Sequence, residues 1–281
     1  MNLIQGMARK VSGLLGRESW VVRGLRPAYE SLLDLSSRGR GVEWTINGET
    51  FRVDPRCRHR LGQNYDAPVA AFIRGRVRPG ALCFDVGANV GVYVMQFARW
   101  SGERGRVVAF EPNPRACAAL RRHVELNGLE GRVEVVPAAV GAAAGEATLY
   151  AAGVHGMSRL GSPNEKIADE VTETSVRVVA LDDFCGARDL RPDWLFIDIE
   201  GFEIAALAGA RRLIKERGEA LNVVVEMHPD AWASADTTRA RAESLLGELN
   251  LRAVPLTGQR DPLGEHGLVQ LVRPGRCDGH Q

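Results

Sequence analysis

The segment Phe84-Asp85-Val86-Gly87-Ala88-Asn89-Val90-Gly91 carries the clearest structural signal in the chain. An apolar strand ends in a carboxylate, and a glycine-rich turn then leads into a helix. Glycines let a backbone approach a ligand closely, and the first turn of a helix offers unpaired N–H groups. The segment therefore predicts a nucleotide-like binding loop in an α/β domain. Its glycine spacing is not the dinucleotide fingerprint GxGxxG, which disfavours an NAD-dependent oxidoreductase.

The chain on either side of this loop predicts a mostly parallel sheet. From Gly80 onward, short apolar runs alternate with longer amphipathic runs, a pattern typical of strands joined by crossover helices. Asn113-Pro114 predicts the start of one helix and Asn127-Gly128 its end, and another helix is expected over 202–217. The predicted strands are 82–86, 106–110, 133–136, 194–199 and 222–227, with 252–255 and 268–272 as an antiparallel closing pair.

The first 75 residues differ in pattern from the rest. Helical periodicity extends to about Leu35, and a hairpin of 42–46 and 50–53 is expected around Asn47-Gly48. We predict a cap over residues 1–75 that makes substrate or dimer contacts, and a catalytic domain over 76–281. Within that domain, the polar stretch 153–172 is too long for a simple connection and predicts a lid.

Composition narrows the classes of partner. The 281 residues include 36 Lys plus Arg against 35 Asp plus Glu, a balance that argues against a nucleic-acid partner. The five cysteines form no CxxC pair, so a reducing, cytoplasmic location is expected. No apolar run has the length of a signal peptide or a membrane span. An apolar stripe near the start leaves peripheral membrane contact or a homodimer open as alternatives; it consists of Ile4, Met7, Val11, Leu14 and Leu15.

Acidic residues follow the predicted strands at the edge where ligands bind in open α/β sheets. Glu111 ends the second strand, 24 residues after Gly87, and a carboxylate there suits the paired hydroxyls of a ribose. Asp198 and Glu200 belong to the end of the fourth predicted strand, where alternation would project both side chains to one side. The carboxylates of Asp85, Glu111, Asp198 and Glu200 are therefore expected to face one crevice.

Glu226 and His228 follow the fifth strand, and histidine is the side chain most easily poised to take a proton near neutral pH. We predict His228, Asp198 and Glu200 as catalytic residues. The metal-free arrangement is the primary expectation, because these groups can hydrogen-bond an amino group or a hydroxyl directly. The alternative is a divalent cation such as Mg²⁺, which would lower the pKa of an acceptor hydroxyl; its ligands would be Asp198, Glu200, Glu226 and His228.

Together these motifs resemble the FkbM-type family of S-adenosylmethionine-dependent methyltransferases. The matching segments run in family order from about Arg78 to Asp230; they are 85–93, 110–114, 126–127, 139–141, 181–184, 197–203 and 226–228. The resemblance implies a class I, Rossmann-like methyltransferase fold with a seven-stranded sheet in the order 3-2-1-4-5-7-6 and helices on both faces. Phe196 departs from the lysine that family members often carry, so any role of that lysine is in doubt here.

The resemblance also implies where S-adenosylmethionine binds. The loop residues Asp85, Gly87, Ala88, Asn89 and Gly91 would cradle the methionine part, with Asp198 nearby. Glu111, followed by Pro112, would bind the ribose, and Ala139 and Val140 would form the adenine-side wall. Family members mostly methylate hydroxyl oxygens of sugars, glycolipids or polyketide-like natural products.

The function expected from the sequence is therefore O-methylation of such an acceptor. A nucleic-acid amino-methyltransferase is disfavoured. Enzymes of that class carry an Asp/Asn-Pro-Pro-Tyr motif after the fourth strand, whereas this chain has Asp198-Ile199-Glu200-Gly201 there. A catalytically inactive cofactor-binding or scaffold protein stays open as the alternative.

Overall fold

The computed structural model describes residues 20–58, 61–151, 158–160 and 172–275. The predicted apolar stripe of Ile4 to Leu15 and most of the predicted lid 153–172 lie outside these residues. Among the residues described, no helix is both long enough and apolar enough to cross a membrane.

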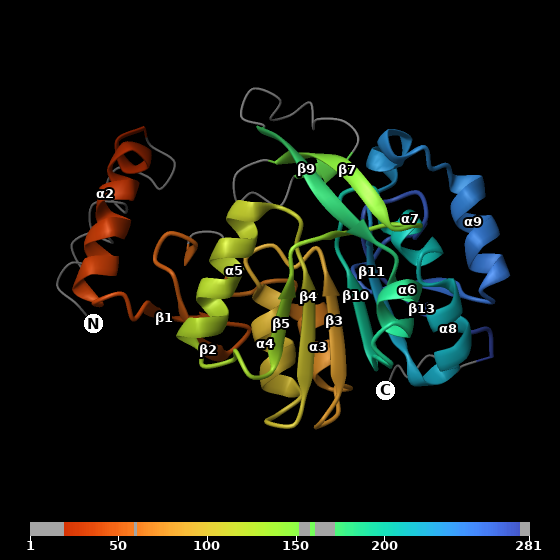
Figure 1. The fold of residues 1–281 in the computed structure, drawn as a ribbon, viewed down its shortest axis with the longest axis horizontal. Helices are drawn as coiled ribbons and strands as arrows, with labels where there is room; N and C mark the ends of the chain where they lie inside the picture. Colours follow the sequence, from red (N-terminus) through yellow and green to blue (C-terminus); the bar gives the residue numbers. More distant parts are fainter. Residues whose placement is uncertain (1–19, 59–60, 152–157, 161–171, 276–281) are drawn as a thin grey trace.

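The main sheet has seven strands in the order β12-β13-β11-β10-β3-β4-β5. Numbered along the chain, this is the predicted order 3-2-1-4-5-7-6, and only β13 runs antiparallel to its neighbours. The class I methyltransferase topology is thus confirmed (Figure 1). The strands are β3 (Leu82–Val86), β4 (Arg106–Phe110), β5 (Val133–Val136), β10 (Trp194–Ile197), β11 (Asn222–Met227), β12 (Arg252–Pro255) and β13 (Gly267–Val272).

Helices cover both faces of this sheet, which explains why the central strands are apolar on both sides. Phe84 and Leu195 pack into one core with the helices α6 to α9, whereas Cys83 and Trp194 pack into the other with α3 to α5. The helices of the first face are α6 (Leu181–Gly186), α7 (Glu203–Ala208), α8 (Arg211–Arg217) and α9 (Arg239–Glu248). Those of the second are α3 (Ala67–Arg74), α4 (Val92–Trp100) and α5 (Pro114–Leu126).

Local sequence signals account for most helix boundaries but not for all. Asn113 caps α5 as predicted, because its side-chain oxygen accepts a hydrogen bond from the N–H of Arg115 at 3.0 Å. The single helix predicted over 202–217 is wrong, since the chain forms α7 and α8 with a break at Gly209. A Cβ on Gly209 would overlap the carbonyl oxygen of Gly141, so this glycine lets another part of the chain approach closely. Short 3₁₀ helices follow at η3 (Gly218–Ala220) and η4 (Pro229–Ala235).

A smaller sheet lies over one end of the main sheet. Its strands β6 (Ala139–Val140), β7 (Gly145–Ala151), β8 (Arg159–Leu160) and β9 (Thr172–Val179) have the order β6-β9-β7-β8. In Figure 1, β7 and β9 cross above the upper ends of β3, β4 and β10. The smaller sheet therefore helps to wall the edge where the acidic tips lie.

The N-terminal region forms α2 (Trp20–Ser36) and the predicted hairpin of β1 (Val42–Ile46) and β2 (Glu49–Val53). Asn47 and Gly48 take positive φ angles of 50° and 80°, which a two-residue hairpin turn of type I′ requires. The Asn47 side-chain amide donates to the carbonyl oxygen of Tyr65 at 2.7 Å and to Gln96 Oε1 at 2.9 Å. These bonds attach the hairpin to α4 and hold the segment before α3 in place.

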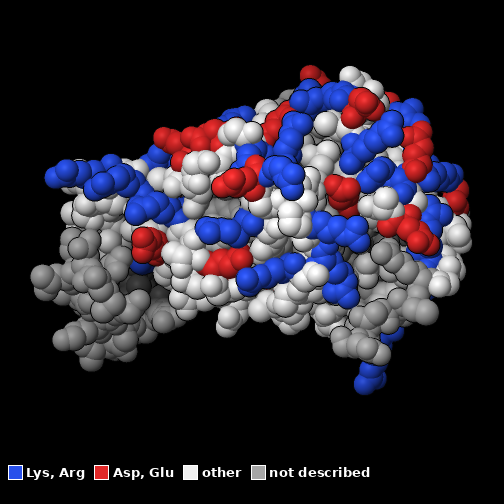
Figure 2. Space-filling model, turned by 90° about the horizontal axis from the view of Figure 1, so that it is seen from below, with Lys and Arg blue, Asp and Glu red and all other residues white. Residues whose placement is uncertain are grey.

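The surface carries charges of both signs. On the face shown in Figure 2, Lys and Arg side chains lie among Asp and Glu side chains rather than in one basic field. Ion pairs account for part of this mixing, for example Arg211 and Lys215 with Glu248 at 3.1 and 2.9 Å. This face does not show the basic stripe that phosphate contacts need.

Candidate active site

The glycine-rich loop after β3 and the tip of β4 meet at one edge of the sheet. The N–H groups of Gly87 and Ala88 both donate to the carbonyl oxygen of Phe110 at 3.0 Å. The N–H of Asn89 donates to Glu111 Oε2 at 2.7 Å. Three N–H groups of the loop are thus bonded to the end of β4, and these hydrogen bonds hold the loop in one conformation.

The two glycines of the loop are required by packing within the protein. Gly87 has a φ of +86°, and a Cβ there would overlap the carbonyl oxygen of Asp198. Gly91 has a φ of +93°, and a Cβ there would overlap Leu120 Cδ1 of α5. The sequence analysis explained these glycines by the close approach of a ligand. That explanation is incomplete, because Asp198 and Leu120 fill the space that side chains at these positions would occupy.

A cavity opens over the loop and encloses about 1090 Å³, part of it open to solvent. Every residue predicted to bind the cofactor lies in its wall: Asp85, Gly87, Ala88, Asn89, Gly91, Glu111, Pro112, Ala139, Val140 and Asp198. Glu200 lines it as well, whereas Glu226 and His228 do not.

The cavity wall also contains residues that the sequence analysis did not single out for the site. They are Tyr65, Tyr93, Asn113, Leu149, Ser158, Leu160 and Phe202, among others. Tyr93 and Phe202 belong to segments that carry the family resemblance, so the sequence could have identified them as site residues. Tyr65 comes from the N-terminal region, and Ser158 comes from the predicted lid and accepts from the Asn113 amide at 3.1 Å. No sequence motif around Tyr65 or Ser158 indicates that either residue lies in a binding site.

Three polar atoms in this wall are buried without a hydrogen-bond partner among the described residues: Asp85 Oδ2, Asn89 Oδ1 and the Tyr93 hydroxyl. Burial, together with the carboxyls of Asp198 and Glu111, raises the pKa of Asp85 well above its ordinary value. A ligand with a positive charge and hydrogen-bond donors would satisfy these atoms and offset the excess of carboxyl groups. Sulfonium, amino and ribose groups of S-adenosylmethionine have this chemistry, so the residues present fit the cofactor that the sequence implies.

Glu111 is positioned by two backbone donors. Its Oε1 accepts from the N–H of Asn113 at 2.7 Å, and its Oε2 accepts from the N–H of Asn89 at 2.7 Å. Burial raises the pKa of Glu111 to about 7, while these two hydrogen bonds lower it. Each carboxylate oxygen keeps a further lone pair, which can accept a hydrogen bond from a ligand hydroxyl.

Asp198, in the cavity wall beside the loop, forms a carboxyl pair with Glu226. The strand predicted over 194–199 ends at Ile197, so the expected alternation of Asp198 and Glu200 along a strand is wrong. Instead, the N–H of Asp198 donates to the carbonyl oxygen of Val86 at 2.9 Å, which places its side chain beside β3. Burial and the adjoining Glu226 carboxylate, which it hydrogen-bonds, raise the pKa of Asp198 well above its ordinary value. Asp198 in the cavity wall is therefore joined by a hydrogen bond to a second carboxyl outside the wall.

His228 lies behind this pair and not in the cavity wall. Its Nδ1 is 3.8 Å from Oε1 of the buried Glu203, and its own N–H donates to the same oxygen at 2.6 Å. Trp232 Nε1 also donates to Glu203 Oε1, at 2.8 Å. Glu203 thus fixes the turn that follows β11.

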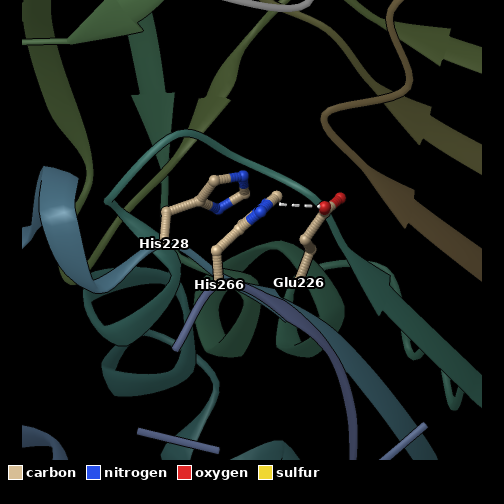
Figure 3. A group of neighbouring side chains, drawn as sticks. All are labelled: Glu226, His228 and His266. Carbon is tan, nitrogen blue, oxygen red and sulfur yellow. Dashed lines mark ion pairs between the residues drawn. The ribbon is translucent and has the colours of Figure 1, made fainter. Parts of the chain in front are cut away.

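The four residues that the sequence offered as ligands of a divalent cation do not form one group in the structure. In the part of the chain that is described, ligand atoms of Glu226 and His228 gather with His266, all within 4.8 Å of one another (Figure 3). Asp198 and Glu200 are not members of this group. Sequence reasoning missed His266 because it lies in the turn-rich segment before β13, far along the chain from the other two.

Comparison with known proteins supports one family. The family described as "Methyltransferase FkbM domain" matches residues 85–249. Ribosomal protein L11 methyltransferase of Pelotomaculum thermopropionicum is 43% identical over 60 residues, which are 21% of this chain and 19% of that protein. The 31-O-demethyl-FK506 methyltransferase FkbM of Streptomyces tacrolimicus is 43% identical over 58 residues, 21% of this chain and 22% of that protein. The match thus spans about a fifth of each curated relative.

Among solved structures, the methyltransferase FkbM of Methylobacillus flagellatus KT is 18% identical to this chain, with a TM-score of 0.47. The alignment covers 77% of this chain and 51% of that chain. The family match, by contrast, includes the glycine-rich loop, Glu111, Asp198 and His228, and it extends over more than half of the sequence. On that match, the protein belongs to the FkbM methyltransferase family.

Proposed function

We propose that the protein transfers a methyl group from S-adenosylmethionine to a hydroxyl oxygen of a sugar, glycolipid or natural-product acceptor. The observation that carries this proposal is the cavity in which the loop 85–91 and Glu111 are joined by a hydrogen bond, with Asp198 also in the wall. Family membership supports methyl transfer as the reaction.

The residues of the cavity have distinct tasks in this proposal. The loop from Asp85 to Gly91 would hold the methionine part, and Glu111 would accept hydrogen bonds from the ribose hydroxyls. When bound, the cofactor supplies a methyl group already activated by its sulfonium. What the protein adds is alignment of the acceptor oxygen with that methyl group and exclusion of water.

The Asp198–Glu226 pair would take the acceptor's proton. Asp198 lines the cavity and hydrogen-bonds Glu226, and its raised pKa favours uptake of a proton. As the new carbon–oxygen bond forms and the carbon–sulfur bond breaks, the O–H proton passes to this pair. The predicted catalytic residues left both His228 and Asp198 open as the base; His228 lies outside the cavity wall, so we assign the proton to the pair that contains Asp198. Glu200, also in the wall, would contact the acceptor.

The hydroxyl acceptor rests on similarity and is the part most in need of a test. One relative is named as an O-demethyl-FK506 methyltransferase and the other as a ribosomal-protein methyltransferase, at equal identity over short segments. Labelled S-adenosylmethionine should be incubated with glycans, glycolipids, hydroxylated metabolites and ribosomal protein. We expect label in a hydroxylated small molecule; label only in protein would overturn the O-methylation proposal.

Cofactor affinity is expected to depend on pH through Glu111. Its pKa is about 7, so the carboxylate becomes protonated as the pH falls through 7 and loses acceptor capacity for the ribose. Affinity for S-adenosylhomocysteine should therefore fall about tenfold from pH 8 to pH 6. Calorimetric titrations at both pH values measure this, with Glu111→Gln as the matched control. If that variant shows the same pH dependence as the parent, another group is responsible.

Asp198→Asn is expected to lower kcat by about 100-fold or more, because an amide cannot take the acceptor's proton. Steady-state kinetics with the identified acceptor would measure this loss. Asp230→Asn, at an exposed carboxylate outside the cavity wall, is the matched control and should turn over like the parent. Unchanged kcat in Asp198→Asn would show that the carboxyl pair is not the proton acceptor.

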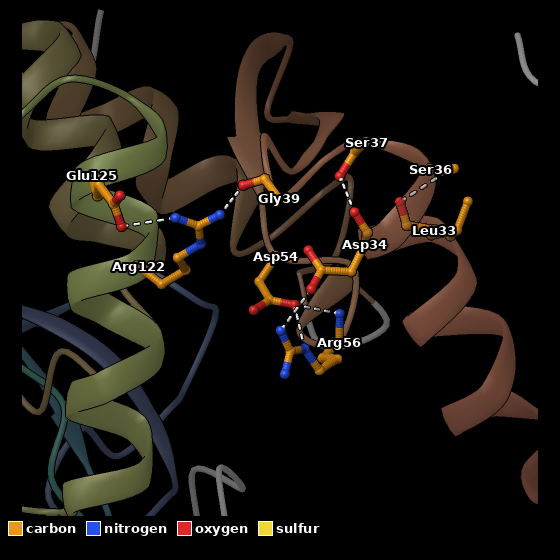
Figure 4. A network of polar contacts seen from close by, with 9 residues as sticks. All are labelled: Leu33, Asp34, Ser36, Ser37, Gly39, Asp54, Arg56, Arg122 and Glu125. Atoms are coloured by element: carbon orange, nitrogen blue, oxygen red, sulfur yellow. Dashed lines mark hydrogen bonds and ion pairs between the residues drawn. The ribbon is translucent and has the colours of Figure 1, made fainter.

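The N-terminal region is proposed as a cap on the acceptor side, because it contributes Tyr65 to the cavity wall. One of the contacts drawn in Figure 4 joins it to the catalytic domain. Arg122 of α5 donates to the carbonyl oxygen of Gly39 and pairs with Glu125 at 2.8 Å. Arg56 bridges Asp34 of α2 and Asp54 at 3.0 and 3.1 Å, which joins the helix to the segment after the hairpin.

A further inference from the structure

Two imidazoles and one carboxylate converge beside the carboxyl pair. Glu226 is part of β11, His228 follows that strand, and His266 stands immediately before β13. Glu226 Oε1 and His266 Nε2 are 2.9 Å apart, and the two imidazole rings have their centroids 4.8 Å apart. Figure 3 shows the three side chains pointing toward one another from these separate segments. The pairing of β11 with β13, Met227 opposite Gly267, brings them together.

The distances suit a shared ion. Ligand atoms bound to one metal ion at about 2.0–2.2 Å lie roughly 3 Å or a little more from one another. The Glu226–His266 separation of 2.9 Å already approaches this value, and the three ligand atoms lie within 4.8 Å of one another. Small side-chain rotations would bring all three into one coordination sphere, because His266 is 56% exposed and free to adjust toward the ion.

The charge around Glu226 favours a cation. The carboxyls of Asp66, Glu200 and Glu203 act on Glu226, and Asp198 hydrogen-bonds it. An ion with two positive charges at this place would offset the accumulated negative charge more fully than histidines can.

The donor set indicates which class of ion. Imidazole nitrogens suit Zn²⁺, Co²⁺, Ni²⁺ and Fe²⁺, whereas Mg²⁺ and Ca²⁺ prefer sets made of oxygen ligands. Two nitrogens and one oxygen leave at least one coordination position for water or for an oxygen of a bound molecule.

We propose that Glu226, His228 and His266 bind a divalent transition-metal ion such as Zn²⁺. This set differs from the ligands that the sequence offered for a divalent cation as the alternative to a metal-free site, since it includes His266 and excludes Asp198 and Glu200. The ion would lie one hydrogen-bonded carboxyl away from the cavity, because Glu226 bonds Asp198 and Asp198 lines the cavity wall. Binding of the ion does not depend on the proposed methyl transfer and can be measured without any acceptor.

The test is a calorimetric titration of the full chain, first stripped with a chelator, with Zn²⁺ and separately with Mg²⁺. We expect one Zn²⁺ per chain and much weaker binding of Mg²⁺. His266→Gln and Glu226→Gln should each weaken Zn²⁺ binding by roughly 100-fold, since each removes one of three ligands. Asp230→Asn, an exposed carboxylate two residues from His228, should bind Zn²⁺ like the parent.

If the variant at the more buried Glu226 fails to fold, His266→Gln still tests the metal site. The His266 side chain is largely exposed, so its replacement should leave the fold intact. A visible absorption spectrum with Co²⁺ gives a second measurement, in which nitrogen and oxygen ligation is expected without a thiolate band. Zn²⁺ affinity that is unchanged in His266→Gln would overturn the proposal, as would Mg²⁺ binding as tight as Zn²⁺ binding or a thiolate band with Co²⁺.

Discussion

Gly87→Ala is expected to lower the free energy of unfolding by about 3 kcal/mol or more and to abolish measurable binding of S-adenosylhomocysteine. The position has a φ of +86°, which an alanine adopts only with strain. The added methyl would also overlap the carbonyl oxygen of Asp198, which is backbone and cannot rotate away. Either the loop or the end of β10 must shift, and both belong to the cavity wall. Urea denaturation and calorimetry measure the two effects.

Gly128→Ala is the matched control for this substitution. Gly128 also has a positive φ, +63°, but a Cβ there would meet nothing within 4 Å. Its cost should be only the backbone strain of about 1 kcal/mol, with ligand binding retained. Equal losses of stability in the two variants would mean that the close approach of the loop to Asp198 has no special importance.

Glu111→Ala is expected to weaken S-adenosylhomocysteine binding by about 100-fold, or about 3 kcal/mol, with the fold retained. The substitution removes the acceptors proposed for the ribose, and hydrogen bonds to charged groups contribute about 1.5–3 kcal/mol each. It also leaves the N–H groups of Asn89 and Asn113 without their partner, so the loop loses one of its three hydrogen bonds to the end of β4. Calorimetric titration of parent and variant measures the change.

Glu134→Ala provides the control for Glu111→Ala. Glu134 belongs to the neighbouring strand β5, is half-exposed and pairs with Arg188 at 2.9 Å outside the cavity. Its removal should leave ligand affinity unchanged, because a surface ion pair contributes little even to stability. If Glu134→Ala and Glu111→Ala bind equally well, the ribose assignment of Glu111 is wrong.

The sequence predicted the parts of the structure that depend on local patterns. The strand, turn and helix around Asp85 and the hairpin turn at Asn47-Gly48 are specified by neighbouring residues, and both are present. The strand order follows from the family resemblance, since alternating strands and helices alone admit several orders.

The features that local patterns failed to predict depend on contacts between distant segments. The break between α7 and α8 arises where Gly209 lies against Gly141, and no periodicity in 202–217 records that contact. His266 reaches Glu226 only through the pairing of β13 with β11, and Tyr65 reaches the cavity through the hairpin. His228 was expected in the crevice because its strand ends there, but the turn held by Glu203 places it behind the carboxyl pair.

The most direct test of the account is a calorimetric titration of the unmodified chain with S-adenosylhomocysteine, beside an identical titration with NAD. Because the loop from Asp85 to Gly91 and Glu111 are joined in one cavity wall, we predict one binding site per chain for S-adenosylhomocysteine and no heat with NAD. Absence of heat with S-adenosylhomocysteine, or saturable binding of NAD instead, would contradict the proposed adenosyl site and the methyl transfer that depends on it.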